Sequence, residues 1–267
     1  MNETNMQIIE DLPFEDYLAL DRLSSSGIKT LLRSPAHYQW ARANPSQGTA
    51  AQQLGTLLHM RVLEPQRYAT SVRVAPAVDR RTKAGKEAYE AFQGSMEDHH
   101  VLATDEQDKL VADMADRILS HRVASALLSD CRTELTVLWE EEGIPCKARF
   151  DALPAGHQVI VDLKTAQTAD YEGFAKAAGN FGYHVQSAFY SMAARRAGLG
   201  DRPLVFVVIE NTPPHEVALY HLDGPEVGAG ANRVQHALSI YRECQASNQW
   251  PGYPVEIQAL TLPKWAL

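Results

Sequence analysis

Two carboxylates and one ammonium group fall on two neighbouring strand-like stretches of this sequence. Asp151 ends the stretch Lys-Ala-Arg-Phe-Asp, and Asp162 and Lys164 lie in the apolar stretch Val-Ile-Val-Asp-Leu-Lys. The residues between them, 154–157, read Pro-Ala-Gly-His and are of the types that reverse a chain. The pattern predicts a hairpin that brings the three charged groups together at the ends of adjacent strands, which is a first indication of a site.

A strand that ends in Asp-x-Lys also occurs as an ordinary surface ion pair, and a single instance is more often that than a catalyst. Here Asp151 followed by Asp162-Leu163-Lys164 resembles the signature of the PD-(D/E)xK nuclease superfamily. Phe150 departs from the formula, because it stands where the proline that names the superfamily would be.

Four more side chains are candidates for the site. The apolar stripe of residues 49–64 predicts a helix with His59 beside its leucines, where a histidine is more often a core residue than a metal ligand. A helix over 183–197 would carry Gln186 and Tyr190 one turn apart on a single face. Glu134, on a predicted strand over 133–141, is either an outer carboxylate of the site or an exposed strand-end residue, and both readings stay open.

A basic segment precedes and begins a predicted helix through Tyr89 and Phe92. It contains Arg80, Arg81, Lys83 and Lys86. Positive charge is unfavourable at a helix N-terminus, so a solvated helix start explains the segment less well than contact with a phosphate backbone does. We predict that the segment binds DNA.

The order of predicted elements is helix, three strands, helix, strand, which resembles the core layout of the same superfamily. The strands are expected over 133–141, 144–153, 159–165, 204–210 and 216–222, and further helices over 104–129 and 232–247. Residues 1–22 read as a loosely structured lead-in. We predict an α/β (α+β) fold, a restriction-endonuclease-like core with a mixed central sheet flanked by helices. We expect one domain, 1–267, with a mainly helical part (1–130), a catalytic sheet core (131–222) and a C-terminal helix and tail (223–267).

Taken together, His59, Asp151, Asp162-x-Lys164 and Gln186-x-x-x-Tyr190 resemble the RecB-type branch of the superfamily. The surrounding stretches Leu-Gly-Thr-Leu-Leu-His, Arg-Arg-Thr-Lys-Ala-Gly-Lys and Gly-Tyr-His-Val-Gln-Ser-Ala-Phe-Tyr are similar to the C-terminal nuclease domain of the RecE family, exodeoxyribonuclease VIII. The similarity extends over about residues 15–265.

That resemblance implies a role for each candidate residue. His59, Asp151, Asp162 and the backbone carbonyl of Leu163 would bind Mg²⁺, with Mn²⁺ as a substitute. The cation would polarise the phosphate and lower the pKa of bound water. Lys164 would orient or deprotonate the attacking water, and Gln186 and Tyr190 would position that water or the DNA strand.

The resemblance also implies a biological activity. We expect a Mg²⁺-dependent exonuclease that digests linear double-stranded DNA processively from its 5′ ends and leaves 3′ overhangs for recombination and repair by strand annealing. The family works as a ring-shaped homotetramer that supplies DNA to a RecT-like annealing protein. Because the chain lacks the long N-terminal extension of the bacterial protein, we expect a stand-alone form encoded by a phage or prophage.

Composition limits the other classes of protein. Hydrophobic residues make up 45% of the 267 residues, which is typical of a globular protein, and no apolar run is long enough to span a membrane. The net charge of −8 is unusual for a DNA-binding protein, so the basic residues must be concentrated. Three scattered cysteines predict reduced thiols in a cytoplasm and match no iron–sulfur or zinc spacing.

Two other functions remain as alternatives. One is a structure- or single-strand-specific nuclease of the same superfamily, and the other is a DNA-binding module that has lost catalysis. The complete set of His59, Asp151, Asp162 and Lys164 argues against the second, because a decayed site should have lost at least one of them.

Overall fold

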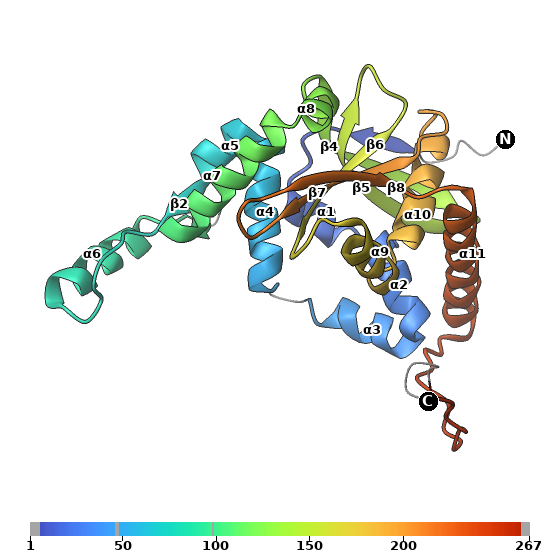
Figure 1. The fold of residues 1–267 in the computed structure, drawn as a ribbon. Coiled ribbons are helices and arrows are strands. Elements are labelled where there is room, and N and C mark those ends of the chain that lie inside the picture. Colours follow the sequence, from blue (N-terminus) through green and yellow to red (C-terminus); the bar gives the residue numbers. More distant parts are fainter. Residues whose placement is uncertain (1–5, 46–47, 98, 263–267) are drawn as a thin grey trace.

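A six-stranded mixed sheet forms the centre of the computed structural model, which describes residues 6–45, 48–97 and 99–262 (Figure 1). Strands β6 and β7 run parallel, and every other neighbouring pair is antiparallel. The predicted mixed sheet flanked by helices is confirmed. In sheet order the strands are β1 (Gln7–Ile9), β4 (Cys131–Glu141), β5 (Ile144–Pro154), β6 (Ile160–Ala166), β7 (Leu204–Glu210) and β8 (Val217–His221).

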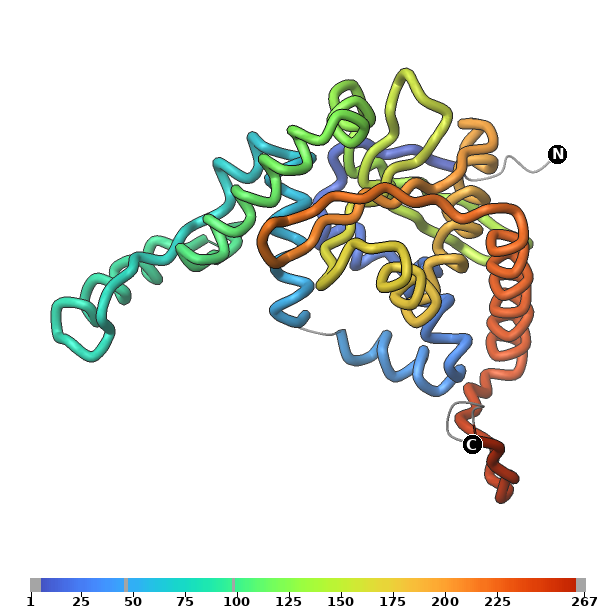
Figure 2. Tube along the Cα trace, viewed as in Figure 1, coloured from blue at the N-terminus to red at the C-terminus, as the bar shows by residue number. Residues whose placement is uncertain are grey.

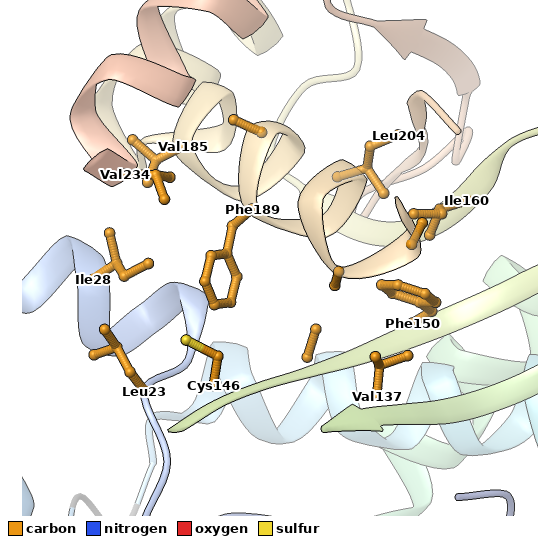
Figure 3. Close-up of a cluster of buried hydrophobic side chains, with 14 of the residues drawn as sticks. Leu23, Ile28, Val137, Cys146, Phe150, Ile160, Val185, Phe189, Leu204 and Val234 are labelled. Carbon is orange, nitrogen blue, oxygen red and sulfur yellow. The ribbon is translucent and has the colours of Figure 1, made fainter. Parts of the chain in front are cut away.

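Helices cover both faces of the sheet, and each face has its own apolar core. On one face the core includes Phe189, which lies among Leu23, Ile28 and Cys146 (Figure 3). On the other it includes Leu58. The first layer contains α2 (Ser25–Arg33), α3 (Pro35–Ala43), α9 (Tyr171–Asn180), α10 (Tyr183–Arg196) and α11 (Gly224–Ser247), and the second α4 (Ala50–Leu63), α5 (Pro65–Ser71), α7 (Asp105–Ser120) and α8 (Arg122–Leu128).

The two cores explain the sequence of β6. Ile160 belongs to one core, while Val161 and Leu163 belong to the other, so the strand is apolar on both faces. Asp162 and Lys164 interrupt this pattern on the face that carries Ile160. Buried charges are rare in such a strand unless they are paired, so their position requires partners.

The N-terminal region is more ordered than predicted. Strand β1 pairs with β4, and helix α1 (Phe14–Ala19) packs beside the sheet. The ammonium group of the buried Lys147 donates to the carbonyls of Tyr17 at 2.7 Å, Leu18 at 3.1 Å and Leu20 at 2.8 Å. These carbonyls end α1, so a lysine about 130 positions away along the chain satisfies groups that the helix leaves unpaired.

Other element boundaries also differ from the predictions. The helix expected over 104–129 divides at His121, whose backbone is extended and whose Nδ1 caps α8 by accepting from the backbone N–H of Ala124. Helix α11 begins at Gly224 rather than at residue 232, because Pro225 fits the first turn of a helix.

None of the described helices is both long and apolar enough to cross a bilayer.

An arm extends away from the sheet between α5 and α7 (Figure 2). It contains two short parallel strands that the sequence did not predict, β2 (Val72–Val74) and β3 (Val101–Ala103). Helix α6 (Lys83–Gly94) lies at its far end (Figure 1). The arm therefore carries the beginning of α6, with its basic residues, away from the central sheet.

Candidate active site

His59 is held by the helix that a capping box begins. Thr49 accepts from the backbone of Gln52, whose side chain accepts from the backbone of Thr49, and this fixes the start of α4. His59 Nε2 lies 2.9 Å from the carbonyl oxygen of Leu163 on β6. Because a carbonyl can only accept, Nε2 carries the hydrogen. In the neutral ring Nδ1 is then free to act as a ligand.

The free nitrogen of His59 faces two carboxylates. His59 Nδ1 lies 3.6 Å from Asp151 Oδ2 and 3.9 Å from Glu134 Oε1. All three side chains are largely buried, with exposed fractions of 27% for His59, 13% for Asp151 and 12% for Glu134. The three residues offer ligand atoms that lie within 4.8 Å of one another.

Asp151 occupies the place where β5 and β6 separate. The register between these strands consists of the single pair Ala152–Val161. Two residues further along β6, the backbone N–H of Leu163 donates to Asp151 Oδ2 at 2.8 Å instead of to a backbone carbonyl of β5. The carboxylate thus replaces a strand partner, and the separation of the strands lets helices on both faces of the sheet reach one site.

Glu134, whose role the sequence left open, belongs to this group. Its φ of 52° is in the left-handed region, which is uncommon for a residue other than glycine. The β4–β5 register passes from Thr133–Ala152 to Leu135–Phe150 without a pair at Glu134 and Asp151. The interruption lies where the two carboxylates approach His59, and backbone strain of this kind is concentrated at functional sites.

Arg149 holds Glu134 in place from the next strand. Its Nε donates to Glu134 Oε2, and its Nη1 donates to the carbonyl of Leu12 at 2.7 Å. The guanidinium is buried, with its central carbon 5.5 Å from the ring centroid of Phe14. The sequence pattern alone assigns no role to Arg149. Its alternation with Asp151 along one strand was the available signal, but its partners on β4 and near α1 are set by the tertiary structure.

Charge and burial shift the pKa values of the cluster in different directions. Burial lowers the pKa of His59, but the carboxylates of Asp151 and Glu134 outweigh it and raise that pKa to about 9. Burial raises the pKa of Asp151 to about 7. Burial also raises the pKa of Glu134, but His59 and Arg149 outweigh it and hold that pKa below its usual value. In the metal-free site His59 is therefore protonated at neutral pH. The carboxyl group of Asp151 loses its proton only near neutral pH.

Asp162 and Lys164 form a second group on the opposite face of the sheet. Lys164 Nζ forms an ion pair with Asp162 Oδ2, and Gln186 Nε2 on α10 donates to Asp162 Oδ1 at 2.5 Å. Burial lowers the pKa of Lys164, but Asp162 and Asp151 outweigh it and raise that pKa, which keeps the ammonium charged. Leu163, between Asp162 and Lys164 on β6, contacts His59 through its carbonyl and Asp151 through its backbone N–H, so the two groups adjoin.

The other predicted residues lie at different distances from this centre. Tyr190 packs its ring against that of Phe150 in a tilted arrangement, with centroids 5.3 Å apart, and burial raises the pKa of its hydroxyl. The basic segment at the start of α6 lies on the arm, and there Arg80 covers the ring of Tyr89 at 4.4 Å while Arg81 pairs with Asp79. The structure therefore joins the residues of the sheet, α4 and α10, but not the basic segment, into one site.

The donor set fits a divalent cation. Carboxylate oxygens with one imidazole nitrogen suit Mg²⁺ or Mn²⁺, and imidazole favours Mn²⁺ of the two. Burial disfavours the charged form of Asp151 and raises its pKa, and a cation beside this carboxylate would stabilise that form. His59, Glu134 and Asp151 are the residues that would hold it. Asp162 is also predicted as a ligand, but in this structure its two carboxylate oxygens interact with Lys164 and Gln186.

Comparison with known proteins agrees with this geometry. Residues 24–263 match the model of a family described as a PDDEXK-like domain of unknown function, DUF3799. Among solved structures, one named "Putative exonuclease", from Eubacterium rectale, has a TM-score of 0.59 and 15% identity over 93% of this chain and 97% of that chain. The structure of SSO0001 has a TM-score of only 0.32 and 15% identity, over 73% of this chain and 88% of that one, too low to inform the fold. No curated protein matches.

Proposed function

The chain belongs to the DUF3799 family of PDDEXK-like domains, and on that premise we propose that it is a metal-dependent exonuclease acting on linear double-stranded DNA. The observation that carries the proposal is the meeting of the two groups at the separation of β5 and β6. There His59 and two carboxylates adjoin the Asp162–Lys164 ion pair.

The residues of the site have different roles in phosphodiester hydrolysis. His59, Asp151 and Glu134 would hold the cation, which when bound supplies positive charge to the phosphate and lowers the pKa of a nearby water. Lys164 stays protonated, so its ammonium stabilises the negative charge that develops on the phosphate and orients the attacking water. Asp162 fixes that ammonium, and Gln186 fixes Asp162 from the other side.

The remaining features belong to the same proposal. Similarity of the site residues to the RecE family supports digestion from 5′ ends that leaves 3′ overhangs for strand annealing, with Mg²⁺ as the cation. It also supports a ring-shaped homotetramer and a RecT-like partner. The exposed basic residues at the start of α6 would contact the phosphate backbone of the duplex at a distance from the site.

Digestion of labelled DNA tests the proposal. Linear duplex carrying a label at either the 5′ or the 3′ end, and a closed circle of the same sequence, are incubated with the protein in Mg²⁺, in Mn²⁺ and in EDTA. We expect metal-dependent release of the 5′ label first and no cutting of the circle. Asp162→Asn and Lys164→Met should lose at least about a thousandfold of this activity while the protein stays folded.

Other results would change the assignment. Cutting of the circle would identify an endonuclease. Metal-independent binding without cleavage, by folded protein, would identify a DNA-binding module. Full activity of Lys164→Met would refute the assigned role of Lys164.

A further inference from the structure

A second lysine lies beside the ion pair of the site. Lys29 belongs to α2, a helix whose start is fixed by Ser24, which accepts from the backbone N–H of Gly27. Its stem passes close to Gly182, where a Cβ atom would lie only 3.1 Å from Lys29 Cδ. Gly182 also has a φ of 64°, so glycine suits this position both for its backbone and for the space it leaves to the lysine.

The ammonium groups of Lys29 and Lys164 lie close to one aromatic ring. Lys29 Nζ is 6.0 Å and Lys164 Nζ 5.3 Å from the ring centroid of Tyr183, the first residue of α10. Lys29 is half-buried, and burial together with the charge of Lys164 lowers its pKa, while the carboxylate of Asp162 opposes this shift only in part. The ring of Tyr183 thus contacts two ammonium groups, one from α2 and one from β6.

Lys29 differs from the other lysines at the centre of the fold in what it binds. Lys164 has Asp162 as its partner, and Lys147 donates to three carbonyls. Across residues 6–45, 48–97 and 99–262, the ammonium of Lys29 has neither a hydrogen bond nor an ion pair; its contact is the ring of Tyr183. A half-buried cation facing another cation is unfavourable, and packing alone would be served better by an apolar side chain.

We propose that Lys29 binds a backbone phosphate of the DNA strand being cut, adjacent to the phosphate at Lys164. The negative charge of that phosphate would offset the repulsion between the two ammonium groups, and its oxygens would satisfy the hydrogen-bonding capacity of Lys29. This inference rests on the proposed function, because it assumes that a DNA strand enters the site. It makes Lys29 a positioning residue for the strand rather than a participant in bond cleavage.

Lys29→Met tests the contact, because methionine keeps an unbranched stem beside Gly182 and removes the charge. Lys29→Arg keeps the charge, and Lys109→Met removes an exposed lysine of α7 as a matched control. Binding of a fluorescein-labelled linear duplex is measured by anisotropy in EDTA across a range of NaCl concentrations, and KM and kcat are measured with metal. Melting temperatures report on folding.

The expected result is specific to a phosphate contact. Lys29→Met should raise Kd and KM about tenfold, change kcat less than about threefold, and reduce the slope of log affinity against log salt by about 1. Lys29→Arg should stay within about threefold of the native Kd, and Lys109→Met should be unchanged. A folded Lys29→Met protein with native Kd and native salt slope would overturn the proposal. So would equal losses of affinity in Lys29→Met and Lys29→Arg, which indicate disturbed packing instead of lost charge.

The two proposals fail separately in this experiment. If the native protein cleaves DNA and Lys29→Met behaves like it, the phosphate contact is wrong and the nuclease stands. If the native protein binds DNA through Lys29 but cleaves nothing in Mg²⁺ or Mn²⁺, the nuclease is wrong and the contact stands.

Discussion

Replacing Arg149 by leucine should destabilise the protein and disturb its candidate metal site together. Arg149 and Glu134 form a buried pair, with side-chain exposed fractions of 7% and 12%. The substitution removes the cation from Glu134 and also removes the donor to the carbonyl of Leu12. A buried carboxylate that loses its partner pays its full desolvation cost, whereas loss of both partners is less harmful.

The size of the effect follows from these contacts. Breaking a buried ion pair by removing one partner typically costs about 3–5 kcal/mol. His59 lies 3.9 Å from Glu134 and partly compensates its charge, so we expect a loss at the lower end, about 3 kcal/mol. For a chain of this size that loss lowers the melting temperature by about 6–12 °C. Glu134→Gln keeps an acceptor for Arg149 and should cost only about 1–2 kcal/mol.

Denaturant unfolding of the two single variants and the double variant, in EDTA, measures the coupling. We expect Glu134→Gln with Arg149→Leu to be no less stable than Arg149→Leu alone, because the double variant leaves no unpaired charge. The titration is then repeated with Mn²⁺, which should stabilise the native protein more than either single variant. Native stability in the Arg149→Leu protein, or strict additivity of the two substitutions, would refute the reasoning.

Two further predictions concern metal linkage and DNA binding. In the absence of metal the pKa of His59 is about 9 and that of Asp151 about 7, so the metal-free protein binds more protons than the metal-bound protein. Metal binding must therefore displace protons, and it becomes more favourable as the pH rises. The rise in melting temperature caused by Mn²⁺ should be small at pH 6 and grow as the pH approaches 9. Thermal scans of the native protein and of His59→Ala, which should show little rise at any pH, check this, and a rise independent of pH would contradict it. Replacing both Arg80 and Lys86 by alanine should weaken duplex binding and reduce its salt slope by about 2, with kcat unchanged at saturating DNA. An unaltered salt slope in the anisotropy titration would remove the arm from the DNA-binding surface.

Local physics explains which elements the sequence predicted well. The helix containing His59 and the helix after Thr104 both begin with capping boxes, in which the partners are three residues apart. Strand β7 spans Leu204–Glu210, the apolar run predicted for it, because burial on both faces leaves a continuous signal. Elements whose partners are distant were missed or shortened, such as β1, which depends on β4 for its pairing.

The sequence by itself determined the chemistry available to this protein: Asp151, the Asp162-x-Lys164 strand, a histidine on a capped helix, and Gln186 one turn before Tyr190. These follow from spacing of two residues along a strand or about four along a helix. Only the tertiary structure decided that Glu134 joins His59 and Asp151, that Arg149 holds Glu134, and that Lys29 stands beside Lys164. The physical reason is that these contacts depend on where β5 and β6 separate and on how α2, α4 and α10 pack over the two faces, and no local period of the chain encodes such contacts.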